Sequence, residues 1–119
     1  ELLNTALEDV QATIGKLGEW AMASQTDVDE IYKVGLNTTR LLMMVGDLVI
    51  GWLLLRQAEV AAAALAAGAS DKDKDKDFYT GKVEAAKWFA HNRLPLLTAE
   101  KVAALNTDLD IMKLPESAF

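Results

Sequence analysis

The chain has 119 residues, a formal net charge of −6 at pH 7, 51% hydrophobic residues and no cysteine. This length predicts one domain, residues 1–119, large enough to bury a single core. The acidic balance argues against binding to nucleic acid or to an anionic membrane surface, because both require a basic face. The absence of cysteine excludes disulfides, thiolate metal sites and cysteine nucleophiles. It also makes the reducing cytoplasm the expected compartment.

The first predicted element is an amphipathic helix near the N-terminus. Apolar residues recur from Leu3 to Ala21 at spacings of three and four residues, which places them in one stripe along a helix. We expect the polar residues between them, Asp9 among them, to face solvent. Gly15 and Gly18 lie on nearly one face of this helix and predict a close crossing with another helix.

A second helix is predicted from a start signal at residues 24–27, Ser-Gln-Thr-Asp. Thr26 can cap the exposed backbone amides, and acidic residues from Asp27 onward suit the positive end of the helix dipole. No proline follows until well beyond Gly68, so one helix of about 40 residues is expected, with a break near residues 35–38 as the alternative.

The centre of this second helix, residues 41–55, has the sequence LLMMVGDLVIGWLLL. A helix that is apolar around its whole circumference must be buried, either in a protein bundle or in lipid. A membrane span needs roughly 20 apolar residues, whereas this run is bounded by Arg40 and Arg56 and contains Asp47. We therefore expect a central bundle helix, and a transmembrane helix is the alternative.

Four residues inside this run have specific expected roles. Gly46 and Gly51 lack side chains and therefore allow a neighbouring helix to approach closely. Asp47 is expected to be at least half-buried and paired with a Lys or Arg of a neighbouring helix, with a catalytic acid as the alternative. Trp52 is expected in the core.

The second half of the chain begins with an alternating Asp-Lys run, which ends at residue 77 and predicts a solvated connector. The interleaved lysines argue against a calcium loop. An aromatic-rich helix should follow from residue 78 and end near Arg93, because Pro95 cannot continue it. A short helical segment is expected at residues 96–105. The apolar tail at residues 109–119 is expected to lie across the bundle or to dock onto another part of the protein.

The sequence offers little of the chemistry that an enzyme needs. His91 is the sole histidine and is expected either on a helix surface or in a hydrogen bond. Glu84 is followed three residues later by Lys87, so the Glu-x-x-His motif of di-iron bundles is missing, and no glycine-rich phosphate loop occurs. We predict an all-α, up-and-down bundle of three to four helices with a long central helix, and no catalytic, metal-binding or cofactor-binding residue.

Two stretches nevertheless resemble a known family. Residues 46–58, GDLVIGWLLLRQA, and residues 78–97, FYTGKVEAAKWFAHNRLPLL, are similar to the C-terminal domain of large bacterial acyl-CoA dehydrogenases. In that family a G-x-x-x-x-G-W helix followed by an Arg precedes a helix that opens with F-Y-x-x-K and closes at L-P. The structural motif comprises Gly46, Asp47, Gly51, Trp52, Arg56, Phe78, Tyr79, Lys82, Phe89 and Pro95.

The resemblance implies a noncatalytic helical domain appended to an FAD-dependent flavoprotein oxidoreductase of fatty acid metabolism. In the family, the catalytic glutamate and the main flavin-binding regions lie in the preceding dehydrogenase domains, so no cofactor is expected in this chain. By the same resemblance, the bundle packs against those domains, supports a homodimer and helps to shape the acyl or flavin pocket. A helical pattern already running at Glu1, without an initiator Met, also leads us to expect a fragment of a longer chain.

Two other functions are compatible with the same residues. One is an independent helical module for protein–protein interaction, in which an open groove or the apolar tail receives a partner helix. The other is attachment to a membrane through the tail or an exposed helix face, which the acidic charge disfavours. The Asp-Lys run is not a feature of the family pattern, and we interpret it as a variable loop.

Overall fold

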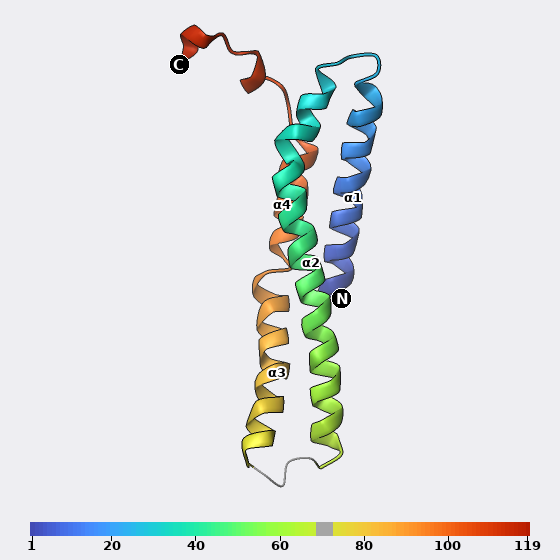
Figure 1. The fold of residues 1–119 in the computed structure, drawn as a ribbon, viewed down its shortest axis with the longest axis vertical. Helices are drawn as coiled ribbons and strands as arrows, with labels where there is room; N and C mark the ends of the chain where they lie inside the picture. The colour runs from blue at the N-terminus through green and yellow to red at the C-terminus, as the bar shows by residue number, and fades with distance from the viewer. Residues whose placement is uncertain (69–72) are drawn as a thin grey trace.

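The computed structural model describes residues 1–68 and 73–119, and every regular element in those residues is helical (Figure 1). The predicted all-α class is therefore confirmed. In chain order the elements are α1 (Leu2–Ala23), α2 (Glu30–Ala66), α3 (Asp73–Asn92), α4 (Leu96–Leu105) and two short 3-10 turns, η1 (Ile111–Lys113) and η2 (Glu116–Ala118).

α2 runs along the whole bundle, and the other helices pack beside one half of it or the other (Figure 1). α1 lies antiparallel to the first half of α2, and α3 lies antiparallel to the second half. α4 continues beyond α3 and packs against α1 and α2. The bundle is 69 Å in its longest dimension. Among the described helices, one half of the bundle is formed by α1, α2 and α4, and the other half is formed by α2 and α3.

The long central helix is confirmed, but its start differs from the prediction. α2 is unbroken over 37 residues and begins at Glu30, three residues after Asp27. The Thr26 hydroxyl donates to the carbonyl of Ala23 at 3.1 Å, and the Asp27 carboxylate accepts the amide of Asp29 at 3.2 Å. These polar side chains stabilise turns between the helices instead of capping α2, so the predicted cap is wrong.

In the second half of the chain, the predicted start of α3 is wrong, whereas the predicted α4 is correct. α3 begins at Asp73, inside the segment expected to be a connector as far as residue 77, and residues 69–72 lie outside the described parts of the chain. Alternation of Asp and Lys places opposite charges three residues apart, a spacing that stabilises a helix. The short helix at Leu96–Leu105 agrees with the prediction.

The core lies where α1, α2 and the junction between α3 and α4 meet. Its buried cluster is formed by Ala6, Val10, Met44, Leu94 and Leu97. Partly buried side chains from all three regions pack around this cluster. A single contiguous core of this kind ties helices that are distant in sequence into one body.

Close helix approach occurs at one of the predicted glycines. A Cβ atom added to Gly51 would lie 3.0 Å from Cδ2 of Leu94 and 3.6 Å from Cδ1 of Leu3. An equivalent atom at Gly15, Gly18 or Gly46 would meet nothing within 4 Å. The predicted crossing at Gly15 and Gly18 is therefore wrong within this chain, and Gly51 marks the point where the three regions of the core converge.

The buried stripe of α1 is rotated from the predicted one. Its buried residues include Asp9 and Thr13, whereas Leu7 and Ile14 are more than two-fifths exposed. The reason is that α1 packs against α4 as well as α2, and α4 supplies partners for a polar side chain. The solvent-facing position predicted for Asp9 is therefore wrong.

α2 is buried along a single stripe, which contains Asn37, Met44, Gly51 and Ala61. Trp52 is 52% exposed, so its predicted core position is wrong for this chain. Among the described residues, helices pack on one side of α2, and large apolar side chains on its other side, such as Leu42 and Met43, are exposed. By length and composition α2 could cross a membrane, and 11% of its most apolar window is buried.

The tail turns away from the end of the bundle (Figure 1). Leu109 is buried, but every residue from 111 to 119 is exposed, with Phe119 at 90%. The expectation that the tail lies across the bundle is therefore wrong beyond Leu109. Its alternative, docking onto another part of the protein, stays a prediction.

Candidate functional site

The structure distributes the ten motif residues over several places instead of gathering them into one site. Asp47 belongs to a pair that holds the α3–α4 junction on α2. Its carboxylate accepts a hydrogen bond from Arg93 at 2.7 Å, and its side chain is 16% exposed. The expected pairing of Asp47 with a basic residue of a neighbouring element is confirmed, and it explains this acid without a catalytic role.

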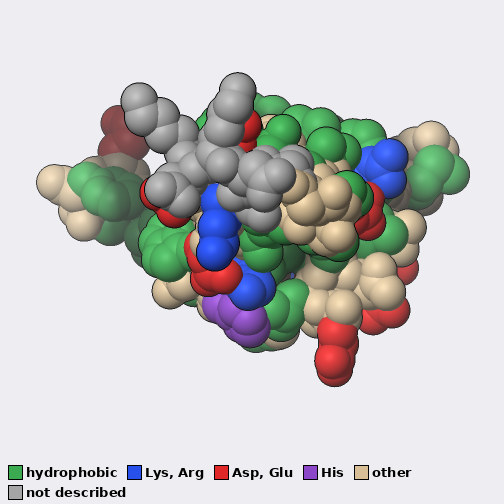
Figure 2. Space-filling model, turned by 90° about the horizontal axis from the view of Figure 1, so that it is seen from below, with side chains coloured by type: hydrophobic (Ala, Val, Ile, Leu, Met, Phe, Trp, Pro, Cys, Tyr) green, Lys and Arg blue, Asp and Glu red, His purple; other side chains and the backbone are tan. Residues whose placement is uncertain are grey.

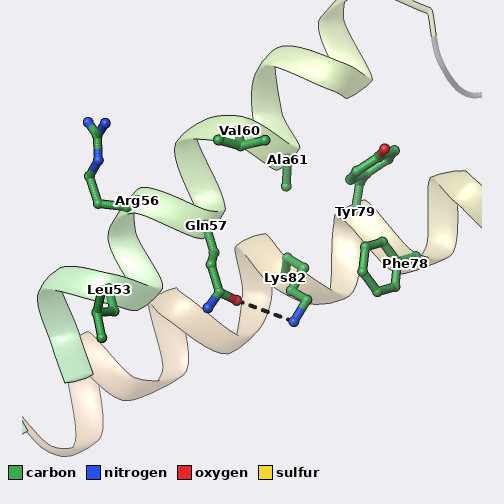
Figure 3. Close-up of a pocket in the computed structure, with 8 residues that line it drawn as sticks. All are labelled: Leu53, Arg56, Gln57, Val60, Ala61, Phe78, Tyr79 and Lys82. Atoms are coloured by element: carbon green, nitrogen blue, oxygen red, sulfur yellow. Dashed lines mark hydrogen bonds between the residues drawn. The ribbon is translucent and has the colours of Figure 1, made fainter.

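Four motif residues, Arg56, Phe78, Tyr79 and Lys82, line one groove between α2 and α3 (Figure 3). We call it the aromatic groove; its volume is 470 Å³. It is completed by Leu53, Gln57, Val60 and Ala61.

The polar side chains of the aromatic groove contact residues in or beside the groove. Lys82 donates to the side-chain oxygen of Gln57 at 3.2 Å, and its ammonium lies 5.4 Å from the ring centre of Phe78. Arg56 points away from α3 and pairs with Glu59 at 2.9 Å (Figure 3). The F-Y-x-x-K pattern therefore joins α3 to α2 at this groove through aromatic packing and one hydrogen bond.

The remaining motif residues lie outside the aromatic groove. Trp52 lines a shallow apolar groove between α1 and α2 together with Leu7. Phe89 packs against the core cluster, and Pro95 is the residue that precedes the first turn of α4. These positions suit packing and helix termination, which are structural tasks.

A second groove is also lined mostly by apolar residues, and we call it the alanine groove. It has a volume of 590 Å³ and runs from the first turn of α1 along α2 and α3. Its lining residues are Glu1, Leu2, Leu3, Gly51, Leu55, Ala58, Glu59, Ala62, Val83, Ala86, Lys87, Ala90, His91 and Leu94. His91 is exposed at its edge, so its predicted surface position is confirmed.

Sequence reasoning missed two buried polar residues that join the helices. Asp9 of α1 accepts hydrogen bonds from the Thr98 hydroxyl and the Lys101 ammonium of α4. Asn37 of α2 donates to the hydroxyl of Thr107 at 2.8 Å. Each lies on the buried stripe of its helix, and a stripe drawn through Ala6, Val10 and Leu17 would have included Asp9.

These polar contacts leave no unsatisfied group in the described interior. Every buried side-chain nitrogen or oxygen there has a hydrogen-bond partner. Among the residues that the structure describes, no three His, Asp or Glu side chains are close enough to hold a metal ion. The described side chains therefore hold the helices together and leave apolar surface exposed.

The comparisons with known proteins identify the kind of domain. Residues 1–115 match the family described as "Acetyl-CoA dehydrogenase C-terminal like". The chain belongs to this family. Its sequence is 53% identical over 118 residues to the broad-specificity linear acyl-CoA dehydrogenase FadE5 of Mycobacterium tuberculosis. That match covers 99% of this chain and 19% of FadE5, so this acetyl-CoA dehydrogenase C-terminal-like domain spans about a fifth of the relative's length.

Family membership agrees with the resemblance found in residues 46–58 and 78–97. Membership also agrees with two features of this C-terminal-like domain. Its described buried polar side chains all have hydrogen-bond partners, and many of its large apolar side chains are exposed. Figure 2 views the molecule from the end formed by α2 and α3, and hydrophobic side chains reach the surface there between charged ones.

Proposed function

We propose that this chain is the noncatalytic C-terminal domain of an FAD-dependent acyl-CoA dehydrogenase. In this proposal it packs onto the preceding dehydrogenase domains and stabilises the enzyme or its homodimer. The family match and the name of the relative support the class of the parent protein. The parent is proposed to be soluble and cytoplasmic.

The observation that carries the proposal is the exposed apolar face of α2. Its large exposed side chains are Leu42, Met43, Val49, Ile50 and Leu53. Soluble monomers rarely expose contiguous apolar patches larger than a few hundred Å². Burial of such a surface contributes roughly 25 cal/mol per Å², so packing on preceding domains would stabilise both partners.

The residues present do not fit FAD. A dinucleotide needs donors for its pyrophosphate, such as a glycine-rich turn at a helix N-terminus, and the sequence contains no such loop. At the edge of the alanine groove, Lys87 is already paired with Glu84 at 2.7 Å. The flavin of the proposed parent is therefore assigned to its preceding domains, and no reaction step is derived from this chain.

An absorption spectrum of the natural full-length protein tests the proposed class. A flavin spectrum that bleaches when one of a panel of acyl-CoA esters is added is the expected result. A colourless protein that responds to no ester would contradict the proposal, and the independent interaction module would replace it.

A second experiment tests the structural role. The full-length protein is compared with a version that lacks residues 1–119, by thermal unfolding and by light scattering. We expect the shortened protein to melt at lower temperature or to lose its dimer while the remaining flavin is still reduced by the ester. Complete loss of reduction in a folded, flavin-loaded shortened protein would show that this domain contributes to the chemistry.

A further inference from the structure

The alanine groove lies on the half of the bundle where only α2 and α3 are present. It begins at Leu2 and Leu3, in the first turn of α1, and continues along both other helices. In Figure 1, α1 ends beside the middle of α2, and no described helix continues its line along the α2–α3 half. The groove therefore extends the space that α1 itself occupies on the other half.

Small side chains make up much of the groove. Ala58 and Ala62 come from α2, and Ala86 and Ala90 come from α3. Small residues at these positions allow a helix backbone to approach closely. Leu55, Val83 and Leu94 complete an apolar lining, so the surface is suited to the apolar stripe of a helix.

The charged residues beside the groove argue against a strongly charged occupant. Glu59 pairs with Arg56 at 2.9 Å, and Lys87 pairs with Glu84 at 2.7 Å. Because each of these charges has a partner on its own helix, neither needs an opposite charge from an occupant. The complementary surface is apolar.

The direction of α1 identifies the occupant. Leu3 of α1, Gly51 of α2 and Leu94 meet at the upper end of the groove, with 3.6 Å between the Leu3 methyl and an added Cβ at Gly51. Extension of α1 toward its N-terminus would place further turns over Leu55, Ala58 and Ala62. At 1.5 Å per residue, the stretch of α2 from Gly51 to Ala62 corresponds to about three helical turns.

We infer that the segment immediately before residue 1 in the full-length protein continues α1 for about three turns and fills the alanine groove. The added turns would make a three-helix bundle of the half that α2 and α3 form. The inference rests on the proposed function, because it needs the longer parent chain that the 19% coverage of FadE5 supports. In antiparallel packing, Ala62 would face a residue about eight to ten positions before residue 1.

A labelling experiment on the full-length protein tests whether the groove is covered. The variants are Ala62→Cys in the groove and Ala12→Cys as a matched control, since both alanines are exposed in this chain. Maleimide labelling at each position is read by peptide mass spectrometry under native and denaturing conditions. We expect native labelling at position 62 to be slower by roughly tenfold or more than at position 12. Equal native rates would overturn the inference.

A disulfide scan identifies what covers the groove. In the Ala62→Cys background, each of about twelve residues before residue 1 is replaced in turn by cysteine and the protein is oxidised. We expect disulfides at positions that recur every three to four residues, with the strongest about eight to ten positions upstream. The same scan in the Ala12→Cys background should give none.

Absence of disulfides, or disulfides without helical periodicity, would overturn the inference even if position 62 is protected. A disulfide to a second copy of the chain, seen as a covalent dimer, would overturn it as well. None of these measurements depends on flavin or on acyl-CoA oxidation. A failure of the inference is therefore distinguishable from a failure of the proposed function.

Discussion

Asp9 of α1 forms an ion pair with Lys101 of α4, and the side chain of Asp9 is 4% exposed. The Thr98 hydroxyl also donates to it, so both partners of this buried acid come from the same short helix. α4 is ten residues long, which is too short to be stable alone in water. Its attachment to α1 therefore depends on this polar contact together with the buried Leu97 and Ala104.

Replacement of Lys101→Met should lower the free energy of unfolding by about 3 kcal/mol, because it leaves a buried carboxylate without its counter-ion. Urea unfolding of the 119-residue chain measures the change. Lys87→Met is the matched control: its pair with Glu84 is 61% exposed on both sides, and exposed pairs contribute at most about 0.5 kcal/mol when they lie on one helix. Equal effects of the two variants would contradict the structural role of Asp9.

Two glycines of α2 should respond in opposite directions to an added side chain. Gly46→Ala should stabilise the 119-residue chain by about 0.5–1 kcal/mol, since Ala has the higher helix propensity and nothing lies within 4 Å. Gly51→Val should destabilise it by about 1–3 kcal/mol, because the new methyl groups would press on buried Leu94. Thermal unfolding of both variants is the measurement. Stabilisation by Gly51→Val would contradict the close packing of Leu94 against Gly51.

Trp52 distinguishes the isolated chain from the complete protein. Because its side chain is 52% exposed, Trp52→Ala should cost the 119-residue chain less than about 1 kcal/mol. If preceding domains cover the groove between α1 and α2 that Trp52 lines, the same change should cost the full-length protein about 3 kcal/mol or more. Trp20→Ala is the control, since Trp20 is buried at 6% exposure and should be costly in both. A small effect of Trp52→Ala in both proteins would place the interdomain surface elsewhere.

The tail should contribute to stability through one residue. Leu109→Ala should lower the free energy of unfolding by about 2–3 kcal/mol, because Leu109 is buried. Deletion of residues 111–119, all exposed, should cost the 119-residue chain less than about 1 kcal/mol. Urea unfolding compares the two variants, and a larger effect of the deletion would mean that the tail packs on the bundle in solution.

Local sequence signals determined the number, order and most of the extent of the helices. Periodic apolar spacing marks α1, and the absence of proline between Asp27 and Gly68 allows α2 to run unbroken over 37 residues. Pro95 separates α3 from α4. Asp47 in an apolar run required a basic partner, and Arg93 is that partner. The helix boundaries depend on neighbours along the chain, which the sequence displays directly. The need of Asp47 for a basic partner also follows from its apolar neighbours, but the choice of Arg93, 46 residues away, was decided by the tertiary structure.

Tertiary packing alone decided which surfaces are buried. Residues 41–55 are apolar on every side, so periodicity cannot select the face of α2 that meets the core or show that Trp52, four residues after the partly buried Leu48, is half-exposed. The burial of Asp9 requires Thr98 and Lys101, about ninety residues further along the chain. Gly51 and Gly46 are equivalent in sequence, and only the approach of Leu94 makes them different. Burial is set by contacts between distant segments, whereas helix formation is set largely by adjacent residues.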